Sequence, residues 1–305
     1  MSRPSQPLVS VCVPTYKRAD RLRSALDKIL HCSYANLEVI VSDNASPDHT
    51  PQVCEELART DARVRYYRHP VNQGATKNFE FARAQATGKY FLWHADDDHL
   101  DPDYIERCVA ELEADPSLVL VAGVAAYHRG DHVTTFRGNV MQPAWRSGIA
   151  RALHYVFFME DNSIFCGLYR RESVSDCHPP VCLAGDSVFV AEVLLHGRGK
   201  VLPEIHVYRE ASDGLSASPK SMVAAVGGPA WQGDYPWLAV PANMARGIAF
   251  GSWKYRDSNA LLQATVYATV FLVSFTKQAI LMVMGKLPFG NRLYKKLFSS
   301  EMGLT

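Results

Sequence analysis

Residues 8–46 read LVSVCVPTYKRADRLRSALDKILHCSYANLEVIVSDNAS, and this stretch decides the fold. It opens with a short apolar, β-branched run over residues 8–13 that Pro14 ends, which is typical of a buried strand. Apolar residues then recur at helical spacing between residues 18 and 31, which predicts an amphipathic helix. Residues 37–42 form a second apolar run. The order strand, helix, strand predicts a βαβ unit with two parallel strands.

The same alternation continues to about residue 125. We expect further strands at 63–68, 89–93 and 118–125, and helices that begin at Thr50-Pro51, at 75 and at Asp101-Pro102. This pattern predicts an α/β fold with a Rossmann-like, mainly parallel sheet flanked by helices. Ligands of such sheets bind at the carboxyl ends of the strands, so the residues that follow each strand are the candidates for a site.

The pattern is less regular after residue 126. We expect a strand at 164–169 and a helix at 187–196. Residues 219–240 are rich in Gly, Pro, Ala and Trp, which predicts a loop or linker. We therefore divide the chain into a catalytic domain of residues 1–218, with halves at about 7–125 and 126–218, and a linker with a C-terminal helical extension at 219–305.

The composition excludes several classes of protein. The chain has 305 residues, of which 48% are hydrophobic and 21% charged, so a sizeable core is available and global disorder is excluded. A formal net charge of +1 argues against nucleic acid as a partner. The seven cysteines form no C-x-x-C pair, which argues against a disulfide framework or a zinc ribbon. With no signal-peptide pattern near the N-terminus, we expect a cytoplasmic protein.

The acidic run Asp96-Asp97-Asp98 follows the apolar strand YFLW. Three consecutive carboxylates repel one another, and burial strengthens the repulsion. A divalent cation relieves that conflict, because carboxylate oxygens are the ligands that Mg²⁺ and Mn²⁺ prefer. The alternative is a solvated acidic turn in which Asp101 caps the following helix. His94 or His206 would complete a metal shell, although a single histidine is more often structural.

Two further segments follow predicted strands. Asp43-Asn44-Ala45-Ser46 places a carboxylate where it can accept from a base or a ribose hydroxyl, although the same residues favour a simple turn. In the segment NQGATKN, Gly74 permits a tight turn and Lys77 lies in the first turn of the next helix. A lysine there would sit beside a phosphate at the helix N-terminus, and the alternative is a surface lysine on a capping turn.

Five segments carry a resemblance through their order and spacing: VSVCVPTYKR, VIVSDNAS, NQGATKN, FLWHADDDHLDP and AGDSVFVAEVLLHG. Over about residues 7–210 the chain resembles family 2 of the nucleotide-sugar glycosyltransferases, which are inverting enzymes of the GT-A fold. The resemblance implies a donor site for a nucleotide-sugar, with uridine as the expected base and thymidine as the alternative. The implied donor-binding residues are Pro14, Thr15, Tyr16, Arg18, Asp43, Asn44, Lys77, Asp96 and Asp97.

The resemblance also assigns the metal. The acidic run would serve as the D-x-D element of the family, which holds Mn²⁺ or Mg²⁺ against the diphosphate. The first Asp of many relatives falls on Ala95 here, so which two of Asp96, Asp97 and Asp98 bind ribose and metal stays open. We assign Asp97 and Asp98 to the metal.

By the same resemblance, Asp186 is the catalytic base. Relatives often have Glu-Asp at this point, whereas this chain has Gly185 before the Asp. A base must reach the acceptor hydroxyl, and an Asp here also suits the N-cap of the next helix. Asp161 and Asp176 are the alternative bases, and Arg209 would help Lys77 to neutralise the departing diphosphate.

The C-terminal segment is unusually apolar. Residues 260–285 read ALLQATVYATVFLVSFTKQAILMVMG, a helix pattern that suits a protein core, a dimer interface or lipid. Its longest uncharged run is about 17 residues, at the lower limit for crossing a bilayer. Residues 286–298 combine apolar residues with lysine and arginine, as an interfacial helix on an anionic leaflet does. We therefore expect contact with the inner face of the cell membrane, a homo-oligomer contact or a core helix.

Together these observations predict an inverting, metal-assisted glycosyltransferase that acts on a polysaccharide or a lipid-linked oligosaccharide. One alternative is a sugar nucleotidyltransferase, although PTYKRADR is not the Gly-rich basic loop that such enzymes carry after the first strand. The other is a nucleotide-sugar-binding protein with weak catalysis, because Gly185 and Ala95 depart from the family pattern.

Overall fold

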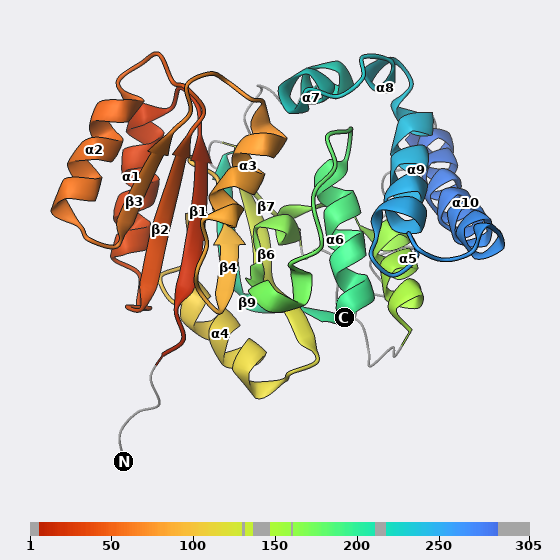
Figure 1. Ribbon diagram of the computed structural model, residues 1–305, viewed down its shortest axis with the longest axis horizontal. Coiled ribbons are helices and arrows are strands. Elements are labelled where there is room, and N and C mark those ends of the chain that lie inside the picture. The colour runs from red at the N-terminus through yellow and green to blue at the C-terminus, as the bar shows by residue number, and fades with distance from the viewer. Residues whose placement is uncertain (1–5, 130–131, 137–146, 160, 211–217, 286–305) are drawn as a thin grey trace.

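The predicted strands of the first half assemble into one side of a single sheet (Figure 1). The computed structural model describes residues 6–129, 132–136, 147–159, 161–210 and 218–285. Within these residues the sheet has the order β3-β2-β1-β4-β8-β6-β9-β5, and β7 pairs with β6. The strands are β1 (Val9–Thr15), β2 (Leu37–Asp43), β3 (Val64–Arg68), β4 (Tyr90–Trp93), β5 (His99–Leu100), β6 (Leu118–Arg129), β7 (His132–Phe136), β8 (Leu168–Arg170) and β9 (Arg198–Glu210).

The first half of the sheet is parallel. β1 pairs in parallel with β2 and β4, and β2 pairs in parallel with β3. In this register Thr15 lies opposite Asp43 at the carboxyl ends of β1 and β2. The end of β4 lies beside them, because Cys12 of β1 pairs with Trp93. The three segments that follow these strands therefore meet at one edge of the sheet, as expected.

The second half of the sheet is mixed. β8 runs antiparallel between β4 and β6, whereas β9 is parallel to β6 and β5 is antiparallel to β9. The pairing of β6 with β9 sets Tyr127 opposite Arg209. The expected fold class is confirmed: an α/β sheet flanked by helices, with a C-terminal helix.

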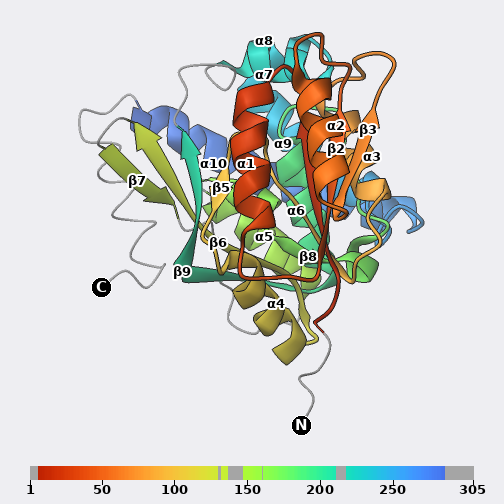
Figure 2. The same cartoon turned by 90° about the vertical axis from the view of Figure 1, so that its left-hand side faces the viewer.

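Helices cover both faces of the sheet (Figure 2). Side chains of α1, α2 and α4 form one core with the sheet, and side chains of α3, α5, α6, α9 and α10 join the other. The helices are α1 (Ala19–Leu30), α2 (Thr50–Thr60), α3 (Ala75–Ala84), α4 (Tyr104–Ala114), α5 (Gly148–Phe158), α6 (Gly185–His196), α7 (Pro219–Val226), α8 (Trp231–Asp234), α9 (Pro236–Arg246) and α10 (Ala260–Gly285). The short helical turns are η1 (Ser163–Cys166), η2 (Arg171–Val174) and η3 (Gly247–Gly251).

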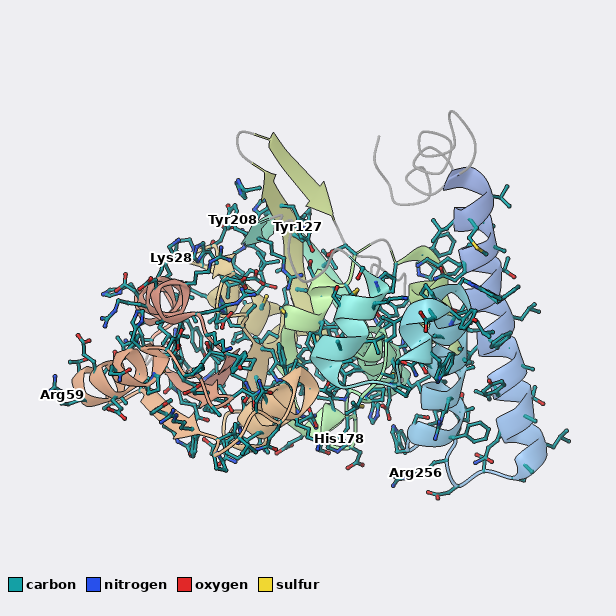
Figure 3. All side chains as sticks on the ribbon, turned by 90° about the horizontal axis from the view of Figure 1, so that it is seen from above. Lys28, Arg59, Tyr127, His178, Tyr208 and Arg256 are labelled. Atoms are coloured by element: carbon teal, nitrogen blue, oxygen red, sulfur yellow. The ribbon has the colours of Figure 1, made fainter. Side chains whose placement is uncertain are left out.

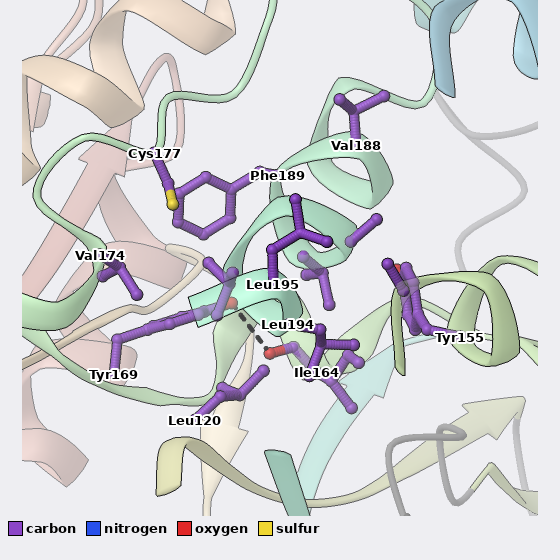
Figure 4. Packing of buried hydrophobic residues seen from close by; sticks show 14 of the residues in the cluster. Leu120, Tyr155, Ile164, Tyr169, Val174, Cys177, Val188, Phe189, Leu194 and Leu195 are labelled. Atoms are coloured by element: carbon purple, nitrogen blue, oxygen red, sulfur yellow. Dashed lines mark hydrogen bonds between the residues drawn. The ribbon is translucent and has the colours of Figure 1, made fainter. Parts of the chain in front are cut away.

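α6 is anchored by aromatic packing in the second core. The Phe189 ring lies 5.5 Å from that of Tyr169 and 5.1 Å from that of Trp93, both in edge-to-face contacts. Figure 4 shows Phe189 together with Tyr169, Leu120 and Ile164, and the hydrogen bond from the Tyr169 hydroxyl to the Ile164 carbonyl. Because these side chains are fully buried, the N-terminal end of α6 is held in a fixed place relative to the sheet.

Two secondary-structure predictions were wrong. The predicted loop at 219–240 contains α7, α8 and the first part of α9, because its Pro and Gly residues mark helix ends rather than a linker. Ser218 caps α7 by accepting from the Ser221 amide at 3.2 Å, and Gly227 ends this helix with a φ of 75°. The predicted strand at 164–169 is mostly the turn η1, and only residues 168–170 pair as β8. The basic segment 286–298 lies outside the described residues.

Candidate active site

Asp96 lies at the carboxyl edge of the sheet, where it is bonded to β1. The Thr15 hydroxyl donates to Asp96 Oδ2 at 2.6 Å, and both side chains are buried. Burial raises the pKa of Asp96, while the Thr15 hydrogen bond and the nearby Arg18 act in the opposite direction. β1 therefore fixes the first carboxylate of the acidic run.

Asp97 faces the start of α1. Arg18 forms a close ion pair with Asp97 Oδ2, and Arg21 Nη1 lies 3.4 Å from the same oxygen. The Asp97 side chain is 27% exposed, against 10% for Asp96 and 8% for Asp98. Asp97 is therefore the carboxylate of the run that a ligand reaches most easily.

Asp98 is paired with Arg209 of β9. Arg209 Nε donates to Asp98 Oδ2 at 2.9 Å, and its Nη1 lies 3.3 Å from the Tyr127 hydroxyl and 3.3 Å from Ser163 Oγ. The Tyr127 hydroxyl in turn donates to Asp161 Oδ2 at 2.7 Å. Asp161, an alternative base in the sequence analysis, is thus part of the hydrogen-bond network around Arg209.

The acidic run is therefore not a solvated turn, and arginine side chains place positive charge beside it. Three arginines face the three carboxylates, whereas the repulsion argument had assigned this task to a metal ion alone. The sequence analysis missed Arg21, although its spacing of three residues from Arg18 places both on one helix face. Asp101 does not cap α4, because its carboxylate accepts from the His206 amide at 2.7 Å and the Tyr208 hydroxyl at 2.8 Å.

His94 and His206 do not belong to a group of candidate metal ligands within the described residues. His94 is fully buried, and burial lowers its pKa to about 4, so its ring is neutral. His206 Nδ1 lies 3.1 Å from Asp101 Oδ2. Among the described residues, no group of three or more His, Cys, Asp or Glu side chains is arranged to hold a metal ion.

Asp43 and Asn44 form hydrogen bonds that connect the end of β2 to neighbouring segments. Asp43 is completely buried and accepts from the Ser46 amide at 2.9 Å and the Tyr66 hydroxyl at 3.0 Å. Asn44 Oδ1 accepts from the Gln73 amide at 2.8 Å, which ties the end of β2 to the loop before α3. Both side chains thus have structural partners, and their contact with a nucleotide stays a prediction.

The other predicted donor residues differ in exposure. Pro14 is buried within β1, whereas Tyr16 is 37% exposed. A hydrogen bond with the Asn72 side chain lowers the pKa of Tyr16. Lys77 is exposed in the first turn of α3. Asp176, the second alternative base, is exposed after η2.

One cavity extends from Ala95, the residue before the acidic run, to Asp186. It has a volume of about 250 Å³ and is lined by Ala95, Arg209 and Asp186 together with apolar side chains of α3 and η1. Met222 and Val226 of α7 form another part of its wall, and α7 lies above α3 and α6 in Figure 1. The segment predicted to be a linker therefore helps to enclose the pocket.

Asp186 lies at the start of α6 and is exposed. Gly185 precedes it for a steric reason: a Cβ at this position would lie 2.1 Å from the carbonyl oxygen of Pro180. The Glu that relatives often carry here cannot fit onto this backbone. The departure from the family pattern thus reflects a close approach of two chain segments.

An α/β sheet with buried carboxylates at its carboxyl edge, beside a pocket lined by Asp186 and Arg209, is typical of α/β proteins that bind a ligand at this edge. Comparison with known proteins narrows this class. The model of the family described as Glycosyl transferase family 2 matches residues 10–177, more than half of the chain, and the chain belongs to this family.

Curated relatives match over shorter segments. Chondroitin synthase of Pasteurella multocida is 33% identical over 115 residues, which are 38% of this chain and 12% of that protein. The GalNAc(5)-diNAcBac-PP-undecaprenol beta-1,3-glucosyltransferase of Campylobacter jejuni is 36% identical over 95 residues, which are 31% of each chain. The match thus spans less than a third of the length of these two relatives.

Solved structures share the fold along nearly the whole chain. The mannosyltransferase PcManGT from Pyrobaculum calidifontis, in complex with GDP-Man and Mn²⁺, has a TM-score of 0.57 at 21% identity and covers 98% of this chain and 81% of its own. S. aureus TarS in complex with UDP-GlcNAc has a TM-score of 0.57 at 17% identity and covers 95% of this chain and 88% of its own.

Proposed function

We propose that the protein is an inverting, metal-assisted glycosyltransferase. It transfers a sugar from a nucleotide-sugar, with a UDP-sugar as the first candidate, to a hydroxyl of a polysaccharide or a lipid-linked oligosaccharide. The observation that carries this proposal is a pocket lined by Asp186 and by Arg209, the arginine that is paired with Asp98 of the acidic run. The names of the relatives support the substrate class, since they include polysaccharide synthases and an enzyme that acts on an undecaprenol-linked glycan.

The donor would bind across the carboxyl ends of β1, β2 and β4. Thr15 and Asp96 form a rigid floor, and the exposed ring of Tyr16 offers a surface for the base. The diphosphate would lie toward Arg18 and the first turn of α3, where Lys77 and the helix N-terminus both favour negative charge.

Asp186 would act as the general base. Its carboxylate is exposed and lines the pocket, so an acceptor hydroxyl can approach it directly. As the acceptor oxygen attacks the anomeric carbon from the face opposite the diphosphate, Asp186 takes the hydroxyl proton. The bond to the diphosphate breaks in the same displacement, and the product has the inverted configuration.

Asp97 and Asp98 fit a divalent cation as hard oxygen donors, and Asp97 is the most open of the three carboxylates. A bound Mn²⁺ or Mg²⁺ would neutralise charge on the departing diphosphate. Two carboxylates from the protein are enough to bind such an ion, because phosphate oxygens of the substrate commonly complete its coordination shell. Arg209 supplies a further positive charge on the pocket wall.

The test is donor turnover by the purified full chain. We would measure release of free nucleotide from UDP-, dTDP- and GDP-sugars with Mn²⁺ and with a chelator, and record the melting temperature with each donor. We expect turnover of one donor class that the chelator abolishes. Asp97→Asn should raise the Mn²⁺ concentration needed, whereas Asp103→Asn at the exposed start of α4 should not.

Two results would contradict the proposal. Stabilisation by a donor without turnover, even with a range of glycan acceptors, would indicate a nucleotide-sugar-binding protein with weak catalysis. Turnover that is unchanged by chelator would remove the metal from the mechanism.

A further inference from the structure

α10 exposes one continuous apolar face. We call this the outer face and define it by residues that are all exposed: Leu261, Ala264, Thr265, Ala268, Thr269 and Leu272. Leu261 is 79% and Leu272 is 64% exposed. Figure 3 shows α10 along one edge of the molecule, with side chains that project away from the rest of the chain.

The opposite stripe of α10 is fixed to the body. Val266, Val270 and Ser274 are buried, as is Lys277, although it is a lysine. The Lys277 ammonium group donates to the backbone carbonyls of Val156, at 3.2 Å, and of Met159 in and just after α5. These contacts set the rotation of α10 about its axis, so the outer face is a permanent surface of the fold.

The outer face has no polar group that requires water. Between Ala260 and Val283 the only charged residue is the buried Lys277. The hydroxyls of Thr265 and Thr269 each donate at 2.8 Å to a carbonyl one turn earlier in α10. Helices that face water normally expose charged or polar residues instead, so this surface is suited to an apolar or interfacial environment.

α10 is long and apolar enough to cross a membrane by length and composition. Its contacts favour a helix that lies along a membrane instead. A spanning α10 would be surrounded by lipid, and Lys277 would lose the α5 carbonyls that now hold its charge. If Val266, Val270 and Lys277 stay packed against the rest of the protein, only the outer face of α10 can contact lipid.

The sequence after α10 is positively charged, so its charge is complementary to an anionic lipid surface. Residues 286–300 contain four cations and no acidic residue: Lys286, Arg292, Lys295 and Lys296. Each lysine or arginine near an anionic leaflet attracts it electrostatically. Trp237 of α9 lies beside α10, with its ring 6.3 Å from that of Phe275, and tryptophan is enriched at membrane interfaces.

We propose that the outer face of α10 docks the protein on an anionic lipid surface, with the helix parallel to the membrane plane. The docking does not rest on the proposed function, because it can be measured without a donor. It would place the enzyme at the inner face of the cell membrane, where a lipid-linked acceptor is available.

The experiment is co-sedimentation of the full chain with vesicles of phosphatidylcholine alone and of phosphatidylcholine with phosphatidylglycerol. We expect binding to the anionic vesicles that alkaline carbonate reverses. Leu272→Lys should weaken it by roughly tenfold or more, the factor expected when one leucine no longer enters the apolar layer. Val71→Lys is the matched control, because Val71 is also 64% exposed but lies outside the C-terminal helices, and it should bind as the unchanged protein does.

Three results would overturn the proposal. Equal sedimentation of the Leu272→Lys and Val71→Lys variants would mean that the outer face does not contact lipid. Binding that resists carbonate would show a spanning helix. A dimer in light scattering that Leu272→Lys dissociates, without vesicle binding by the unchanged protein, would assign the outer face to a second copy of the chain.

Discussion

The carboxyl edge of the sheet and the outer face of α10 differ in how they treat charge: the first concentrates it and the second excludes it. At the sheet edge the chain gathers three carboxylates and balances them with Arg18, Arg21 and Arg209. The outer face of α10 carries no charge, and most of the large apolar side chains that the described residues expose lie between Met222 and Val283. The formal net charge of +1 is thus the sum over two different surfaces, one with clustered opposite charges and one without charge. Four predictions sharpen the first side of this contrast, the sheet edge and the helix α6 beside it, while Leu272→Lys tests the outer face.

The largest effect is expected at Asp186. Asp186→Asn removes the base but keeps the shape of the pocket, so transfer should fall by about 10²–10⁴-fold while donor binding is retained. Initial rates and donor titrations would measure the two quantities separately. Asp176→Asn, an exposed aspartate after η2, is the matched control. If the control lost activity and Asp186→Asn did not, the base would have been assigned to the wrong aspartate.

Arg209→Met tests whether charge pairing holds the sheet edge together. Asp98 is only 8% exposed, so loss of its partner leaves a buried carboxylate unpaired and should cost about 3 kcal/mol of unfolding free energy. Arg21→Met removes a half-exposed arginine and should cost less than about 1 kcal/mol. Urea unfolding would compare the two variants. Equal costs would show that burial does not decide the strength of these pairs.

Gly185→Ala tests the close approach beside Asp186. The new Cβ would lie 2.1 Å from the Pro180 carbonyl oxygen, so the start of α6 must move, at a cost of about 1–3 kcal/mol. The rate of transfer should fall as well, because Asp186 is the next residue. Gly251→Ala is the control, since nothing lies within 4 Å of its added Cβ. A neutral Gly185→Ala variant would refute the steric reason for this glycine.

An effect on stability alone, confined to high pH, is expected at Glu192 inside α6. Burial raises the pKa of Glu192 to about 7, against which Arg256 and Arg83 act, and Asp176 adds to the rise. Because the folded pKa exceeds the unfolded one, the protein should lose stability as the pH rises from about 4.5 to 7. Glu192→Gln cannot ionise, so it should be more stable by roughly 1–3 kcal/mol at pH 8 and unchanged at pH 4.

Unfolding curves at both pH values measure this difference. A variant that is equally stable to the unchanged protein at pH 8 would mean that Glu192 is ionised at no cost. Glu172→Gln, at an exposed position in η2, is a control that should show no such pH dependence.

Much of the fold could be predicted from local patterns. The bounds of α10 at Ala260 and Gly285 and the end of α6 at His196 follow from apolar periodicity and from breaks in it. The predicted linker failed because Pro and Gly mark helix ends as well as loops, and only tertiary packing distinguishes the two. The strand expected at 164 failed because its apolar residues pack as a turn, with Gly167 against β6.

Candidate members of the site could be proposed from the sequence, but their connections could not. Asp96, Asp97 and Asp98 were candidates because they follow a strand, and Asp186 was a candidate through the resemblance to the family. The partner of Asp98 could not be deduced, because Arg209 lies 111 residues away and meets it only through the pairing of β6 with β9. The burial of Asp43 likewise depends on Tyr66 of β3, which no local pattern shows.

The arginines that face the acidic run have a practical consequence. These arginines place positive charge beside the carboxylates, so their repulsion is offset by side chains of the chain itself. If the proposed metal binds, it would add stability by mass action, but we expect the fold to persist without it. The chain should then keep its far-UV circular dichroism spectrum in chelator and regain activity when the ion is supplied.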